Sequence, residues 1–113
     1  MDYAWTSTTF EMPGCHVVRN LGVVRGVTVR AANIGQNIVA GLRSIAGGRI
    51  DEYVNMCEQT RAEAFAIMAA HADQTGANAI LGVRYDATEL AQNMTEVICY
   101  GTAVVVEANA PAG

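Results

Sequence analysis

The sequence predicts an α+β, two-layer fold in which one antiparallel sheet packs against a long helix and a shorter helix. Three stretches carry this prediction. Residues 15–30 are rich in β-branched side chains, residues 51–76 repeat apolar side chains at helical spacing, and residues 77–106 return to a strand-like composition. The 113 residues leave room for one hydrophobic core. We therefore expect a single domain over residues 1–107 and a disordered tail over residues 108–113.

The first β region is expected to be long and bent. Residues 3–9 contain Tyr, Trp and three Thr, which favours a short strand. Residues 15–30 follow, and Gly22 and Gly26 interrupt their β-branched run. Because glycine inside a strand indicates a bend or a bulge, we expect one long kinked strand or two collinear ones.

Two helices are expected in the middle of the chain. Asn33 is a good N-cap for the shorter helix, which the pair Gly47 and Gly48 would end. The long helix over residues 51–76 begins with two acidic residues, which its positive N-terminal end favours, and Gly76 supplies its stop. Its expected apolar face comprises Tyr53, Val54, Cys57, Arg61, Ala64, Phe65, Met68 and Ala72.

The last region predicts a hairpin. Residues 77–87 are expected to begin a strand, residues 86–95 to form a polar connection with its tip near 92–93, and residues 96–106 to form the closing strand. The closing strand is apolar on both faces, which indicates burial on both. Its large face needs a cover that a second copy of the chain could provide. A helix could approach its small face closely, at Cys99, Gly101 and Ala103.

Composition excludes several classes of partner. The apolar fraction of 51% exceeds the need of a small monomer and indicates a homo-oligomer. A net charge of −4 and the lack of lysine argue against nucleic acid as a partner.

No stretch approaches the roughly 20 apolar residues of a membrane span, and the first ten residues lack the features of a signal peptide. Three cysteines without a secretory context predict reduced thiols in the cytoplasm.

Several blocks of the sequence together resemble one family. They are LGVVRGVTVRAANIGQNIVAGLRSIAGGR, then Tyr53 and Arg61, then GANAILGVRYDATE, and finally GTAV. In order and spacing these blocks, which cover about residues 6–106, resemble the YbjQ-like family, whose members carry a heavy-metal-binding label and have no established function. The resemblance implies a two-layer, dodecin-like subunit and a ring-shaped homopentamer that in some cases stacks further, into a decamer. It supplies no established set of ligand residues.

Cys15 and His16 are the candidate metal ligands. Thiolate and imidazole suit zinc or copper(I), and both residues follow a turn at the expected rim of the sheet. Adjacent residues on a strand point to opposite faces, so one chain would rarely offer both to one ion, although copies in a ring could converge. An ordinary strand start is the commoner explanation of such a pair. No CxxC or HxxxH spacing indicates a closed zinc site.

The other thiols and the second histidine have structural explanations. Cys57 lies on the expected apolar face of the long helix, where free cysteine behaves as a small hydrophobe. Cys99 could point towards the same helix, and a thiol pair with Cys57 is conceivable. His71 lies near the C-terminal end of that helix, where a capping or interface role is commoner than metal binding.

The charged residues outside these positions suggest two arrangements. Arg61 is expected on the apolar face of the long helix and would need a carboxylate partner, such as Asp86 or Glu89. Asp86 and Glu89, with Glu96, could alternatively form a hard-cation site or an acid–base pair. A solvated hairpin is the commoner explanation for three acidic residues in such a place.

Three functions from different classes remain open at this point. The favoured hypothesis is a non-catalytic cytoplasmic homopentamer that binds or buffers a small ligand, with a thiophilic metal ion as one candidate. The second is a scaffold ring that binds a partner protein and needs no ligand. The third is an enzyme with a site between subunits. The sequence contains no nucleophile-elbow motif and no Rossmann fingerprint to support the third hypothesis.

Overall fold

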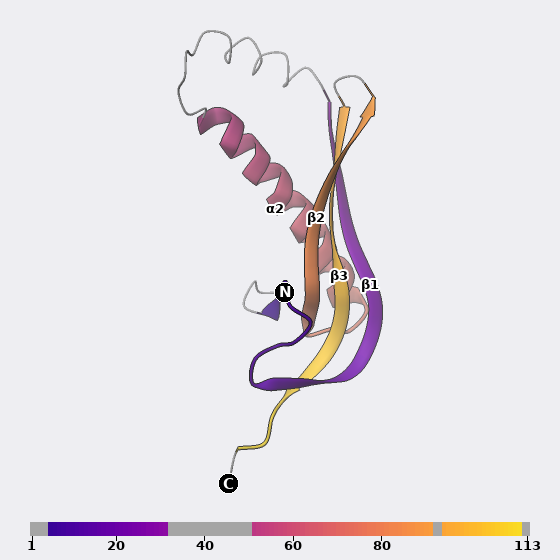
Figure 1. Ribbon diagram of the computed structural model, residues 1–113. Helices are drawn as coiled ribbons and strands as arrows, with labels where there is room; N and C mark the ends of the chain where they lie inside the picture. The colour runs from indigo at the N-terminus through magenta and orange to yellow at the C-terminus, as the bar shows by residue number, and fades with distance from the viewer. Residues whose placement is uncertain (1–4, 32–50, 92–93, 112–113) are drawn as a thin grey trace.

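A computed structural model describes residues 5–31, 51–91 and 94–111. Three strands and one helix occupy these ranges: β1 (Cys15–Ala31), α2 (Asp51–Gln74), β2 (Ala79–Ala91) and β3 (Met94–Ala108). The strands form one antiparallel sheet in the order β1-β3-β2, and α2 crosses one face of it (Figure 1). The expected α+β, two-layer fold is therefore confirmed. The shorter helix expected from Asn33 lies outside the described residues.

Strand β1 is a single strand of 17 residues with irregular pairing near its start. Its register with β3 shifts between Val17 and Arg19 and again between Asn20 and Gly22. Gly22 has a φ of 95°, a left-handed conformation that side chains with a Cβ rarely adopt. The predicted bend is thus located at this glycine.

Helix α2 packs on the sheet through a stripe of small and medium side chains. The buried members are Ala64, Phe65, Met68, Ala69 and Ala72. The helix ends at Gln74, and Gly76 follows it with a φ of 87°, as the sequence predicts.

The expected apolar face of α2 is wrong at two positions, Val54, which is 39% exposed, and Arg61. Arg61 is exposed, with 57% of its side chain accessible, and its ion-pair contact is with Glu58 at 3.9 Å. Thr60 is buried in its place, and Glu63 forms an ion pair of 2.7 Å with Arg30 of β1. The face that meets the sheet therefore keeps Ala64, Phe65, Met68 and Ala72 as predicted, with Thr60 buried where Arg61 was expected.

Strand β3 is the central strand and is buried on both faces over part of its length. Cys99 and Ala103 are fully buried beneath α2. Val104 and Val106 belong to a second cluster, with Met12, Ala79 and Leu81. Because side chains alternate along a strand, the two clusters lie on opposite faces of β3.

The second cluster is covered by the segment that precedes β1. Ser7 donates its N–H to the Ile80 carbonyl at 2.9 Å, and Gly82 donates to the Thr9 carbonyl at 2.8 Å. Thr6 and Ile80 form an isolated parallel bridge, so residues 6–9 pair with β2 much as the predicted short strand would. The chain then places the buried side chain of Met12 over the sheet.

The two strands of the hairpin extend further towards its tip than predicted. The stretch expected as a polar connection, residues 86–95, is mostly strand, because β2 runs to Ala91 and β3 begins at Met94. Thr88 pairs with Glu96 in these exposed arms. Backbone hydrogen bonds continue the ladder past the core, so a polar sequence does not mark where the strands end.

The C-terminal end of the sheet continues beyond the expected boundary at residue 107. Ala108 is the last residue of β3 and pairs with Cys15. Asn109 donates its N–H to the Gly14 carbonyl at 2.9 Å. The first two residues of the expected tail are therefore attached to the sheet.

Away from the second cluster, the sheet face opposite α2 exposes apolar side chains. Val23, Val27 and Val29 of β1 are 73%, 40% and 48% exposed. We call these three valines, with Ile98 and Tyr100 of β3, the open sheet face.

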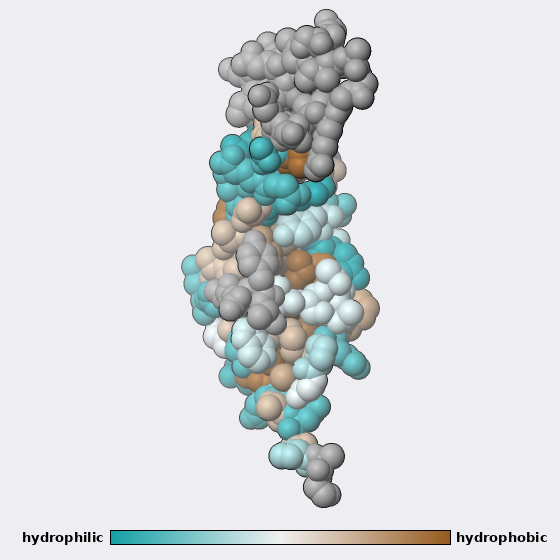
Figure 2. Space-filling view, turned by 90° about the vertical axis from the view of Figure 1, so that its left-hand side faces the viewer, coloured by the Kyte–Doolittle hydropathy of each residue, from teal (hydrophilic) through white to brown (hydrophobic). Residues whose placement is uncertain are grey.

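The chain is elongated. It measures 63 × 27 × 17 Å, and its radius of gyration is 18.0 Å, against about 13 Å for a compact domain of this length. The helix side of the molecule is a mosaic of polar and apolar patches (Figure 2).

Candidate functional site

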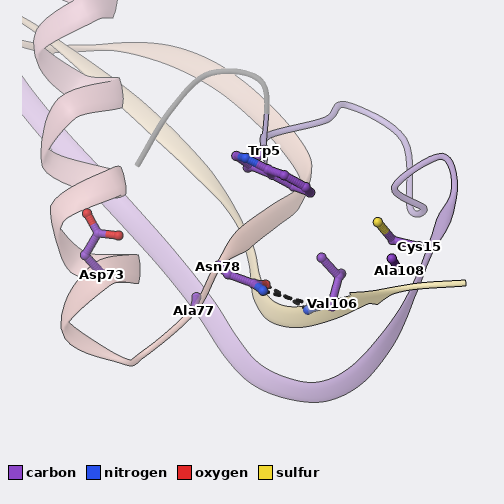
Figure 3. Close-up of a pocket in the computed structure, with 7 residues that line it drawn as sticks. All are labelled: Trp5, Cys15, Asp73, Ala77, Asn78, Val106 and Ala108. Atoms are coloured by element: carbon purple, nitrogen blue, oxygen red, sulfur yellow. Dashed lines mark hydrogen bonds between the residues drawn. The ribbon is translucent and has the colours of Figure 1, made fainter.

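A cavity of about 350 Å³ lies at the C-terminal end of α2. The elements that bound it are the end of the helix, the segment before β1, the start of β1 and the end of β3 (Figure 3). Its lining residues are Trp5, Cys15, Asp73, Ala77, Asn78, Val106 and Ala108. Most of these side chains are apolar, and they come from five separate places in the sequence.

Asn78 fixes the floor of the cavity. Its Nδ2 donates to the Val106 carbonyl at 2.9 Å, and its Oδ1 accepts the Val106 N–H at 2.8 Å. The Asn78 N–H also donates to the Val104 carbonyl at 3.1 Å. The side-chain amide thus makes the same pair of hydrogen bonds with Val106 that a residue of a neighbouring strand would make. It holds the turn after α2 against the sheet and stabilises the shape of the cavity.

Trp5 and Asp73 lie over this floor. The indole of Trp5 is 45% exposed, and in Figure 3 it lies between Asp73 on one side and Cys15 on the other. Asp73 is in the last turn of α2, where the helix dipole is negative. The carboxylate and the thiol are therefore at opposite ends of the cavity.

The strand separates the two predicted metal ligands. Cys15 is half-buried, packs against the second cluster and lines the cavity. His16 is exposed, and its Nδ1 lies 2.9 Å from Oδ1 of Asn109. The two side chains follow the alternation of β1, as expected, and one chain does not bring them together.

The described residues of one chain do not fit a metal site of three or four ligands. Within residues 5–31, 51–91 and 94–111, no three His, Cys, Asp or Glu side chains are grouped closely enough to hold an ion. A heavy-metal ion needs several thiolate, imidazole or carboxylate donors around it. A metal at Cys15 or His16 would therefore require ligands from further copies of the chain.

Of the remaining thiols, Cys99 belongs to the core and Cys57 lies far from it. Cys99 is buried, and its Sγ lies 3.6 Å from Sδ of Met68. Burial raises the pKa of the Cys99 thiol, and a hydrogen bond with Tyr85 lowers it by less. Cys57 is three helical turns before Met68, roughly 16 Å along the helix axis. The conceivable pair of Cys57 with Cys99 is therefore not formed.

His71 and the hairpin carboxylates also lie outside the cavity. The Nδ1 of His71 accepts the backbone N–H of Arg25 at 3.4 Å, so this histidine caps an N–H on the outer edge of β1. Asp86 pairs with Ile98 and therefore faces away from α2, whereas Glu89 faces the other side. Neither carboxylate is the partner of Arg61.

Sequence reasoning missed the two residues that supply the aromatic ring and the carboxylate of the cavity. Trp5 appears in the sequence only as part of a short strand, and Asp73 only as one polar residue on the outer face of a helix. No spacing rule connects positions 5, 73 and 106, because the fold alone brings them together. The only available signal was that Trp5 is the single tryptophan of the chain.

Comparison with known proteins gives relatives along nearly the whole chain. The chain is 49% identical over 104 residues to a UPF0145 protein of Solibacter usitatus, covering 92% of this chain and 93% of the relative. It is 52% identical over 101 residues to a UPF0145 protein of Chromobacterium violaceum, covering 89% and 86%. It is 53% identical over 100 residues to a UPF0145 protein of Sulfurisphaera tokodaii, covering 88% of each.

A solved structure supports the fold. A protein of unknown function from Pediococcus pentosaceus, assigned to the DUF74 family, matches with a TM-score of 0.59 at 22% identity, covering 90% of this chain and 96% of that protein. None of the described helices is long and apolar enough to cross a membrane. Residues 4–107 match the model of the YbjQ family, described as "Putative heavy-metal-binding". The chain therefore belongs to this YbjQ family.

Proposed function

We propose that the chain is the subunit of a non-catalytic, ring-shaped homopentamer that binds a small organic ligand in the cavity beneath Trp5. The cavity is the observation that carries this proposal. Its volume of about 350 Å³ lies within the range of roughly 300–1,000 Å³ that small-molecule sites occupy. Such sites combine apolar walls with a few placed polar groups, and this cavity has that composition.

The arrangement of polar groups supports binding in preference to catalysis. A catalytic nucleophile is commonly activated by a base within hydrogen-bond distance. The Cys15 thiol and the Asp73 carboxylate lie at opposite ends of the cavity (Figure 3), and the Asn78 amide is hydrogen-bonded to the backbone of Val106. The described side chains that line the cavity thus form no nucleophile–base pair.

The shape of the subunit supports assembly into a ring. Strands β1 and β2 lie at opposite edges of the sheet, and residues 6–9 pair with β2 only at its start, so β1 of one copy can pair with the later part of β2, beyond Val83, in the next. A contact between two different surfaces is heterologous, and such contacts generate closed rings when the rotation permits. A neighbouring copy that also packed on the open sheet face would account for its exposed valines. The number five comes from the family resemblance alone.

The metal role of Cys15 and His16 remains a prediction. In a ring, neighbouring copies of either side chain could supply the ligands that one chain lacks. The three free cysteines of the described chain suit a reducing compartment, which supports a cytoplasmic location. The alternative function, a scaffold ring, would use the open sheet face to bind a partner protein.

Native mass spectrometry of the purified protein tests the proposal, because it reports subunit number and bound mass together. We expect five chains of 11.9 kDa plus the mass of a small organic molecule. Binding can also be followed through the fluorescence of Trp5, the only tryptophan. A monomer would contradict the ring. An empty pentamer whose Trp5 fluorescence resists a broad panel of small organic compounds would contradict ligand binding and favour the scaffold.

The same instrument tests the metal prediction. Zinc or copper(I) added under reducing conditions should bind in integral numbers per ring, and Cys15→Ser or His16→Ala should reduce that number. If both variants keep the stoichiometry of the wild type, these residues are not the ligands.

A further inference from the structure

The two edges of the sheet differ in charge. Strand β1 contains three arginines and no acidic residue. Residues 6–9 leave the later part of β2, residues 84–91, unpaired on its outer side. This part is exposed throughout and contains Asp86 and Glu89, against a single arginine, Arg84. The edge that β1 presents is therefore basic, and the free edge of β2 is on balance acidic.

Arg25 of β1 and Asp86 of β2 lie on the same face of the sheet. Arg25 pairs with Tyr100 and Asp86 pairs with Ile98, and both of these β3 residues belong to the open sheet face. Partners directly opposite each other in an antiparallel pair point to one face. Arg25 and Asp86 are exposed, and neither side chain forms an ion pair with a described residue. Each edge thus offers one charge of opposite sign to a second copy of the chain.

These charges select the register in which two copies would meet. Arg25 and Arg84 both pair with Tyr100, so a level contact between β1 and β2 would place two arginines side by side, which is destabilising. A shift must be even, because an odd one turns every side chain to the other face. A shift of about two residues one way meets Gly82, whose N–H is already bonded, and the other way brings Arg25 to Asp86. Closing a sheet into a ring requires a stagger of this kind.

The same register brings two exposed apolar side chains together. Phe10, at 77%, and Val23, at 73%, are the most exposed large apolar side chains of the described residues. The Phe10 ring lies beside β2, with its centroid 6.0 Å from the guanidinium carbon of Arg84. Val23 precedes Arg25 on the same face of β1, so it would lie opposite Arg84 of the second copy and next to its Phe10. One contact would therefore cover both side chains.

We propose that β1 of one copy binds the free edge of β2 of a second copy, with Arg25 paired to Asp86 and Val23 packed on Phe10. This inference rests on the proposed ring, since it names the residues of the contact between its subunits. His71 accepts the Arg25 N–H at 3.4 Å, which is long for a hydrogen bond. A carbonyl of the incoming strand would replace His71 at an ordinary distance, so this cap leaves the edge open to pairing.

Charge reversal in the full chain tests the contact. Arg25→Asp places two carboxylates together, and Asp86→Arg places two guanidinium groups together. Light scattering over a dilution series measures the dissociation constant of the assembly. We expect each reversal to raise the dissociation constant of a contact about tenfold, because an attraction is lost and a repulsion is added. The double variant, which exchanges the two charges, should restore the wild-type value.

Arg61→Asp and Glu58→Arg are the matched controls. These two residues form an exposed pair on α2 and belong to neither edge strand. Their reversals change the net charge of the chain by the same amounts and should keep the dissociation constant of the wild type. Circular dichroism checks the fold of every variant. If one reversal at the edges unfolds the chain, the other decides the test.

Each outcome supports or overturns the proposal. Single reversals that leave the dissociation constant unchanged would overturn this contact, and the ring would then be held by other surfaces. An assembly that the single reversals weaken and the double variant does not restore, or that the controls weaken equally, would overturn the pairing of Arg25 with Asp86. A wild-type protein that is monomeric throughout the dilution series would overturn the contact together with the proposed ring.

Discussion

Gly26 is where β1 and α2 come closest. A Cβ at this position would collide with the backbone oxygen of Ala64 and the backbone nitrogen of Met68. Backbone atoms of a helix cannot move aside as a side chain can, so Gly26→Ala should displace α2. We expect the free energy of unfolding to fall by about 3 kcal/mol, at the upper end of overpacking costs. Urea denaturation of the purified protein measures this change.

Gly14→Ala is the control for Gly26→Ala. Gly14 has a φ of 77° and nothing near its added Cβ, so alanine there meets only backbone strain. Its cost should be about 1 kcal/mol. Equal losses in the two variants would show that the contact between β1 and α2 at Gly26 is looser than described.

Cys99 makes the stability of the protein depend on pH. Burial raises the pKa of this thiol above its ordinary value of 9.0 in the folded chain. Above about pH 9 the unfolded chain therefore holds fewer protons at this position than the folded chain does, and the free energy of unfolding falls as pH rises. The stabilisation is fully present below pH 9 and is lost as pH rises through the folded pKa.

Comparison with Cys99→Ala isolates this effect. The variant has no thiol at this position, so the stability advantage of the wild type over it should shrink as the solution becomes alkaline. Thermal unfolding of both proteins at several values between about pH 8 and pH 10 measures the trend. A difference that stays constant across this range would contradict the raised pKa.

At the scale of elements, Arg30 joins β1 to α2. Its guanidinium contacts Glu63 at 2.7 Å, and its Nε donates to Oγ1 of the buried Thr60 at 3.1 Å. The ion pair is partly exposed and is worth about 0.5 kcal/mol, whereas loss of the hydrogen bond to a buried hydroxyl costs about 1 kcal/mol more. Arg30→Met should therefore lower the free energy of unfolding by about 1–2 kcal/mol in urea denaturation.

Arg61→Met is the matched control, on the helix that Arg30 contacts. Arg61 is exposed and pairs with Glu58 at 3.9 Å, so its replacement should cost less than about 0.5 kcal/mol. The opposite order of the two losses would support the orientation of α2 that the sequence predicts, with Arg61 towards the sheet.

The elements themselves were largely predictable. The long helix and its glycine stop, the long first strand with a bend, and a closing strand buried on both faces follow from local patterns in the sequence. The burial of Thr60 in place of Arg61 was not, because alanines at 62, 66 and 69 leave the apolar stripe of α2 poorly defined and its close contact with Gly26 decides which side chains meet the sheet. Pairing between strands likewise extends the hairpin through polar residues.

At the scale of the whole molecule, the candidate site could not be predicted. Cys15 was singled out for its chemistry, and it does line the cavity. Trp5, Asp73 and Val106 join it only because the first segment folds back along β2 and the end of α2 reaches the end of β3. No local pattern encodes such a meeting of distant segments, and without it the residues at positions 5 and 73 are unremarkable surface residues.

The open sheet face provides the test of assembly. Val27 lies in the middle of this face, opposite Ile98 of β3, and is 40% exposed in the single chain. If a neighbouring copy covers it, Val27→Asp buries an unpaired carboxylate at each contact, which costs several kcal/mol per interface. The ring should then dissociate into monomers in native mass spectrometry and light scattering.

Ala66→Asp is the control for Val27→Asp. It adds the same charge on the exposed side of α2 and should leave the ring intact. A pentamer that survives Val27→Asp would show that the open face lies outside the subunit contacts. The scaffold alternative, in which a partner protein covers this face, would then gain support.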